Sequence, residues 1–154
     1  MKLGLRRSTI DEIDRHARET YPDECCGAVV TAGDEESVRR ITNVQGRLHA
    51  EDPQAHPRDA RTAYFMEPKE LYAVIREGEE PGRALRAFYH SHPEHDAYFS
   101  AEDQARAMAW DEPAYPDAAW VVVSVRGGEV RDRRAYAWDA NERRFAEIPL
   151  AIES

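Results

Sequence analysis

Apolar and polar positions alternate with different periods along the chain, and each change of period marks an expected element. From Ser8 to about Thr20 the apolar residues recur at helical spacing, and Ser8 stands where a helix cap is expected. Cys25 to Thr31 is a short continuous apolar run, which favours a buried strand. Ser37 to Val44 alternates as a partner strand beyond a turn at Gly33-Asp34. The N-terminal part is therefore expected to be a helix followed by a hairpin.

The middle of the chain begins with a polar stretch. Gln45 to Thr62 contains two prolines and no period, so it is expected to be a long loop of a kind that is often functional. Ala63 to Met66 is expected to be a short strand, and Glu67-Pro68 begins a helix that continues to about Glu77. Ala84 to His92 is expected to be a strand that ends at Pro93.

The C-terminal part contains the most apolar segment. The expected elements in this part are a helix from Ser100 to about Trp110, a central strand at Ala118 to Val125, a hairpin turn at Gly127-Gly128, a strand at Val130 to Trp138 and a last strand at Arg144 to Ile148. Residues 1–154 are thus expected to form one α/β domain, with a mixed β-sheet flanked by about three helices.

Composition narrows the possible classes of protein. A chain of 154 residues suits one compact core, and its lysines and arginines are scattered within a net charge of −9, which disfavours nucleic acid as a partner. No segment approaches the roughly 20 apolar residues that a membrane span needs. The N-terminus does not resemble a secretory signal, and the two cysteines form no C-x-x-C pair. These features favour a reducing, cytoplasmic setting, and none of them indicates an oligomeric state.

The candidate chemistry lies in the stretch HSHPEHDAYFSAED, residues 90–103. A strand places side chains i and i+2 on one side, so His90 and His92 present two imidazoles together, as a zinc site requires. The candidates for a third ligand are Glu94, His95, Asp96, Glu102 and Asp103. Asp103 lies in the first turn of the helix expected to begin at Ser100 and can point back toward the strand. Ser100 and Asp103 also form a capping box, which needs no metal.

Taken as a whole, the string resembles a known signature. The residues His90-Ser91-His92, Pro93, Ser100 and Asp103 match the H-S/T-H-x₇-S-x-x-D pattern of the JAMM (MPN-plus) zinc metallopeptidases, and PDECCGAVV offers the upstream glutamate of that family as Glu24, followed by Cys26-Gly27. The resemblance implies a cytidine-deaminase-like fold. It also implies that Zn²⁺ is held by His90, His92 and Asp103, with Glu24 as general base and Ser100 as a donor to the oxyanion.

The same resemblance implies a class of substrate. Members of the family hydrolyse a peptide or isopeptide bond after the C-terminal Gly-Gly of a small ubiquitin-like or sulfur-carrier protein. The segment from Gln45 to Thr62 is a candidate wall for such a tail.

Three alternatives stand beside this interpretation. His90, His92 and His95 resemble part of the metallo-β-lactamase metal motif, although no histidine follows His95. Cys25 or Cys26 as a nucleophile would need a histidine base, and a buried small apolar side chain is the more ordinary role for both. A non-catalytic MPN-type binding or scaffold module is the third alternative.

Overall fold

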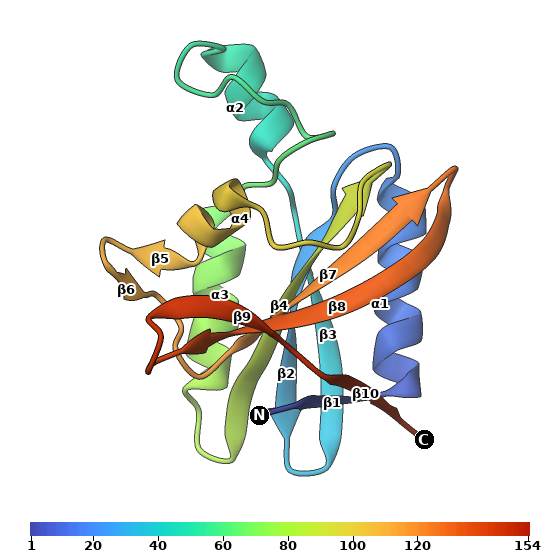
Figure 1. Ribbon diagram of the computed structural model, residues 1–154, viewed down its shortest axis with the longest axis vertical. Helices are drawn as coiled ribbons and strands as arrows, with labels where there is room; N and C mark the ends of the chain where they lie inside the picture. Colours follow the sequence, from blue (N-terminus) through green and yellow to red (C-terminus); the bar gives the residue numbers. More distant parts are fainter.

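A six-stranded mixed sheet forms the centre of the computed structural model, which describes residues 1–154 (Figure 1). The strand order is β3-β2-β4-β7-β8-β9, and β4 and β7 run parallel while the other neighbours are antiparallel. The strands of this sheet are β2 (Cys26–Ala32), β3 (Glu35–Ile41), β4 (Arg83–Pro93), β7 (Ala119–Arg126), β8 (Glu129–Asp139) and β9 (Arg144–Ile148). The predicted α/β class and mixed sheet are confirmed.

The two faces of the sheet carry separate hydrophobic cores. Helix α1 (Arg7–Thr20) covers one face, where Ile10 and Ile13 pack with Val121 and other side chains of the central strands. Helices α3 (Pro68–Gly78) and α4 (Ala101–Arg106) lie on the opposite side in Figure 1, where Phe88 and Trp120 belong to the second core. Alternate residues of β4 and β7 thus enter different cores, as the two-residue period of a strand requires.

A close approach to a neighbouring strand explains the glycine at the second position of β2. A Cβ atom at Gly27 would come within 2.4 Å of the Tyr89 ring. The missing side chain lets Tyr89 lie across β2, where its hydroxyl meets Nδ1 of His16 on α1 at 2.7 Å. Gly27 is therefore required by packing between neighbouring strands.

The structure corrects the expected beginning and end of the chain. The first helix begins at Arg7, its N-cap residue is Arg6, and no side chain caps it, so the expected cap by Ser8 is wrong. Two further strands, β1 (Leu3–Arg6) and β10 (Leu150–Glu153), pair in parallel. Each has only four residues and its partner lies at the other end of the chain, so neither has a local periodic signal.

The segment expected to be a long loop begins with a helix, α2 (Gln45–Glu51), which makes four helices in place of about three. Gln45, the first residue of α2, is buried, and its side-chain Nε2 donates to the carbonyl of Arg58. Residues 52–62 contain no helix or strand, as predicted, whereas the expected strand Ala63–Met66 is reduced to one bridge between Asn43 and Met66. In Figure 1, α2 projects beyond the end of the sheet.

The helix expected from Ser100 to about Trp110 ends earlier, at Arg106. The chain then forms a two-stranded hairpin, β5 (Met108–Ala109) and β6 (Glu112–Pro113). Trp110 lies in its turn with a positive φ of 57° and is 99% exposed. No helix in the structure has the length and apolar character that a membrane crossing requires.

Candidate metal centre

The candidate metal centre lies where β4 ends and β2 begins. His90 and His92 are both buried on β4, and Ser91 between them faces the other way and accepts a hydrogen bond from the backbone N–H of Cys25. This bond fastens β4 to the chain just before β2. The two imidazoles therefore project together from the end of an inner strand of the sheet, as their spacing predicts.

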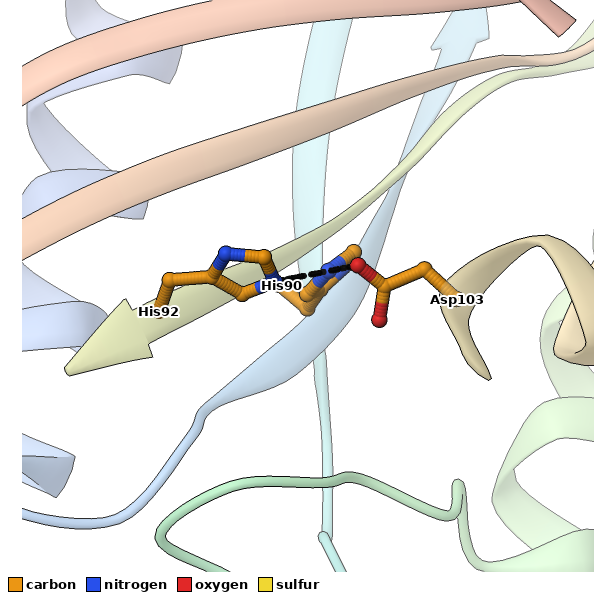
Figure 2. A group of neighbouring side chains, drawn as sticks. All are labelled: His90, His92 and Asp103. Atoms are coloured by element: carbon orange, nitrogen blue, oxygen red, sulfur yellow. Dashed lines mark hydrogen bonds and ion pairs between the residues drawn. The ribbon is translucent and has the colours of Figure 1, made fainter. Parts of the chain in front are cut away.

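Asp103 reaches the two imidazoles from the first turn of α4. Figure 2 shows the three side chains pointing toward one another. Asp103 Oδ2 lies 3.0 Å from Nε2 of His90 and 3.0 Å from Nε2 of His92, and the two nitrogens are 3.3 Å apart. Of the candidates for a third ligand, Asp103 is the one that joins the histidines in a buried group able to hold a metal ion.

The spacing and chemistry of this group fit zinc. Ligand atoms held about 2.0–2.1 Å from a tetrahedral ion lie about 3.3 Å from one another. Separations of 3.0–3.3 Å are close to that value. Two imidazole nitrogens and one carboxylate oxygen form a donor set that zinc accepts, and three protein ligands leave a fourth position for water or substrate.

The capping box expected at α4 is present and determines where Asp103 points. The Ser100 hydroxyl accepts from the backbone N–H of Asp103 at 3.0 Å, and the backbone N–H of Ser100 donates to Asp103 Oδ2 at 3.0 Å. One oxygen of Asp103 thus belongs both to the cap and to the His90–His92 group. Because the Ser100 hydroxyl acts as an acceptor here, its own proton is free for another partner.

Glu24 lies beside this group and is 3% exposed, so it is not the exposed carboxylate that its position alone would favour. Cys26 pairs with His90, and the Ser91 N–H donates to the carbonyl of Cys25. Continuing this antiparallel register by one residue places Glu24 opposite His92 and on the same side of the sheet. Its Oε1 atom is buried without a hydrogen-bond partner.

The electrostatic environment favours the metal-binding forms of these groups. Burial lowers the pKa of His90 and so favours its neutral imidazole. Burial opposes ionisation of Asp103, but the neighbouring His90 and His92 outweigh it and hold the pKa of Asp103 well below its usual range. A carboxylate and a neutral imidazole are the forms that bind metal. Burial, followed by the charges of Asp103 and Glu102, raises the pKa of Glu24 well above its usual range.

The other candidates for a third ligand lie outside the group. His95 and Asp96 are exposed in the loop after β4. Glu102 turns away from the histidines and forms an ion pair with Arg58 at 3.0 Å. The exposed position of His95 argues against the alternative ligand set that includes it.

The cysteines are buried, as expected, and burial makes them poor nucleophiles. The pKa of the Cys25 thiol is raised by burial to about 12, and that of Cys26 is also raised well above its usual range. Reactive cysteines have a lowered pKa and partial exposure. The nucleophilic role is therefore disfavoured.

The sequence does not reveal one residue of the centre, Tyr64. Its ring stacks on the His90 imidazole with centroids 4.5 Å apart, and its buried hydroxyl has no partner. Tyr64 also forms part of the wall of an apolar cavity of about 270 Å³. No spacing rule connects it to the histidines, because it lies in the irregular segment before α3.

The sequence matches a described protein family over most of its length. Residues 6–139 match the family described as prokaryotic homologs of the JAB domain. The chain is 32% identical to the desampylase of Haloferax volcanii over 161 aligned positions, which cover 99% of this chain and 97% of that protein. It is 31% identical over 134 positions to the CysO-cysteine peptidase of Mycobacterium tuberculosis, covering 87% of this chain and 81% of that protein.

Solved structures with similar folds support the architecture. A solution structure of a protein from Desulfitobacterium hafniense has a TM-score of 0.71 at 19% identity and covers 100% of this chain and 94% of its own. A JAB1/MPN domain protein from Archaeoglobus fulgidus has a TM-score of 0.53 at 14% identity, with coverage of 98% and 99%. At these identities the likeness concerns the fold.

Proposed function

The chain belongs to the family of prokaryotic JAB-domain homologues, and we propose that it is a zinc-dependent peptidase acting on small ubiquitin-like or sulfur-carrier proteins. The observation that carries the proposal is the convergence of His90, His92 and Asp103 beside a buried carboxylate without a partner, Glu24. A structural module would have no need of a buried carboxylate left without a hydrogen bond, since that arrangement destabilises the fold.

In this proposal His90, His92 and Asp103 hold the metal ion. When bound, zinc supplies Lewis acidity, which lowers the pKa of a water molecule to about 7 and polarises a carbonyl group. The burial of all three side chains limits competing water and strengthens electrostatic interactions within the site.

Glu24 is proposed as the general base and then the general acid. Its carboxylate accepts a proton from the attacking water and later delivers a proton to the nitrogen of the leaving amine as the C–N bond breaks. Two features support this role, namely the free Oε1 atom and the raised pKa of a buried carboxyl group. A raised pKa brings a glutamate closer to the range in which it can exchange protons at neutral pH.

Ser100 is proposed as the donor to the oxyanion that forms at the attacked carbonyl. Its hydroxyl oxygen is held in place by the backbone N–H of Asp103, and the hydroxyl proton remains free. Helix capping and oxyanion stabilisation are thus compatible within one side chain.

The substrate class is proposed from the relatives and from the resemblance of the motif. The names desampylase and CysO-cysteine peptidase indicate hydrolysis at a small protein modifier or carrier, and we extend this to a bond that follows a C-terminal Gly-Gly. A tail without side chains suits a buried centre, since its backbone can approach the metal closely. The segment from Gln45 to Thr62 is proposed as one wall of the tail's path.

The test is hydrolysis of β-grasp proteins that carry one extra residue after Gly-Gly, together with the same proteins joined through an isopeptide bond. Zinc-loaded protein should cleave at least one of these substrates, and chelation should stop cleavage. Absence of turnover by zinc-loaded protein across several carriers would contradict the proposal and favour a binding module.

A further inference from the structure

The two histidines of the metal centre are supported in different ways. Nδ1 of His92 lies 2.8 Å from the carbonyl oxygen of Asp96, to which it can donate. Nδ1 of His90 is buried and has no hydrogen-bond partner. Histidines that bind metals almost always donate their second ring N–H to an oxygen, which fixes the orientation of the ring. His90 lacks this support, so another contact must hold its ring.

Tyr64 provides the nearest aromatic contact. The rings of Tyr64 and His90 are stacked, with centroids 4.5 Å apart and planes inclined by 28°. Phe99 lies farther from His90, at 6.4 Å with planes inclined by 39°. Tyr64 is 4% exposed, so its ring cannot leave His90 without opening the core.

The backbone around Tyr64 is fixed by neighbours of the metal centre. Arg106 on α4 donates from Nε to the Tyr64 carbonyl at 3.3 Å. The Asn43 amide donates to the carbonyl of Ala63 at 3.2 Å and accepts from the N–H of Phe65 at 3.0 Å. The same amide donates to the carbonyl of Glu24 at 2.9 Å. The segment that carries Tyr64 is therefore tied both to the helix of Asp103 and to Glu24.

We propose that Tyr64 is a positioning residue of the metal centre, whose ring holds the His90 imidazole in the orientation that directs Nε2 toward the metal. It does for His90 by stacking what the Asp96 carbonyl does for His92 by hydrogen bonding. The inference rests on the proposed function in one respect, namely that His90 is a metal ligand.

The ring carries this role, and the hydroxyl does not. The Tyr64 hydroxyl is buried without a partner, so Tyr64→Phe removes no hydrogen bond within the protein and keeps the stacked ring. Tyr64→Leu keeps an apolar side chain and removes the ring. Changes that disturb the support of a metal ligand cost about 10–100-fold in metal affinity, and we expect a loss of this size for Tyr64→Leu alone.

The experiment measures Zn²⁺ affinity by competition with a chelating dye, and the absorption spectrum of the Co²⁺-loaded protein, for the wild type and three variants. The control is Tyr115→Leu, which removes an aromatic ring that lines the same apolar cavity and packs on Phe88 at 4.9 Å. Thermal unfolding of the metal-free proteins is measured in parallel. Both leucine variants should lose stability, but only Tyr64→Leu should lose zinc affinity and show a changed cobalt spectrum.

Three results would overturn the inference: wild-type affinity in Tyr64→Leu, an equal loss in Tyr64→Phe, or an equal loss in Tyr115→Leu. If the wild-type protein itself binds no zinc, the proposed function fails together with the inference. If the wild type binds zinc and cleaves its substrate while Tyr64→Leu binds zinc normally, only the role of Tyr64 fails.

Discussion

The two faces of the central sheet differ in whether their buried polar groups have hydrogen-bond partners. On the face covered by α1, His16 meets the Tyr89 hydroxyl and Asp14 forms two hydrogen bonds with the Arg133 guanidinium. On the other face, Glu24 Oε1, Tyr64 Oη and His90 Nδ1 have no partner. The fourth buried atom without a partner, Oε1 of Gln45, belongs to the segment at the end of the sheet.

The contrast separates the polar groups that stabilise the fold from those left without a partner beside the metal centre, among which Glu24 is the one proposed to act in chemistry. Most buried polar groups in folded proteins are hydrogen-bonded, and one left without a partner costs about 1–3 kcal/mol. Groups without partners are gathered where metal and substrate are proposed to bind. Variants at Glu24 and at Asp14 should therefore have opposite effects, with loss of activity at Glu24 and loss of stability at Asp14.

The largest effect is expected at Glu24. Glu24→Gln removes the proposed base but keeps the size of the side chain, so kcat should fall by about 10²–10⁴. Zinc content should be unchanged, and stability should be equal or higher because a buried carboxylate is gone. Steady-state kinetics, metal analysis and thermal unfolding check these outcomes. A Glu24→Gln variant with normal turnover would refute the role of Glu24.

The second-largest fall in kcat is expected on replacing Ser100. Ser100→Ala should lower kcat by about 10²–10³, because a donor to the oxyanion is lost. It also removes a helix cap, which costs about 1 kcal/mol of stability. Glu67→Ala is a matched control, since the Glu67 side chain caps α3 by accepting from the N–H of Glu70. Equal loss of kcat in the two variants would show that Ser100 acts only through folding.

On the opposite face, Asp14→Ala should affect stability alone. Asp14 is 6% exposed and binds Arg133 through both carboxylate oxygens, so its removal leaves a partly exposed guanidinium without its partner. We expect a loss of about 2–3 kcal/mol in the free energy of unfolding, measured by chemical denaturation. The kcat of the folded variant should equal that of the wild type. A selective loss of kcat would contradict the division between the two faces.

The smallest effect is a pH dependence from His16. Burial and the nearby Arg40 lower the pKa of His16 to about 4, against an ordinary value near 6.5. Between pH 4 and pH 6.5 the His16 imidazole is protonated in the unfolded chain and neutral in the folded protein. The contribution of neutral His16 to the free energy of unfolding is therefore fully present above pH 6.5 and is lost as the pH falls toward 4. Between pH 7 and pH 5 the loss should be on the order of 2 kcal/mol.

His16→Gln isolates this contribution, because glutamine can accept from Tyr89 but cannot be protonated. The difference in unfolding free energy between wild type and variant should change across the same interval of pH. A difference that stays constant from pH 7 to pH 5 would contradict the assigned cause.

The sequence predicts the part of the centre whose residues are close in the chain. His90, His92, Ser100 and Asp103 lie within one strand–loop–helix unit, so strand alternation and capping chemistry suffice to bring them together. Glu24 is more than sixty residues upstream and could be assigned only through the family motif, because its burial depends on strand pairing.

Other features depend on contacts that leave no local pattern. Tyr64 meets His90 only after the irregular segment is tied down by Asn43 and Arg106. The β1–β10 pair joins the two ends of the chain through four-residue strands. Helix α2 has a single buried residue, Gln45, so no apolar stripe distinguishes it from a loop.

The most direct test of the central claim is the zinc content of protein purified without chelator, compared among the wild type, His95→Ala and Asp103→Ala. The first two should retain stoichiometric zinc, because His95 is exposed outside the group, whereas Asp103→Ala should lose it. Full zinc retention by Asp103→Ala, or loss of zinc on replacing His95, would contradict the proposed metal centre.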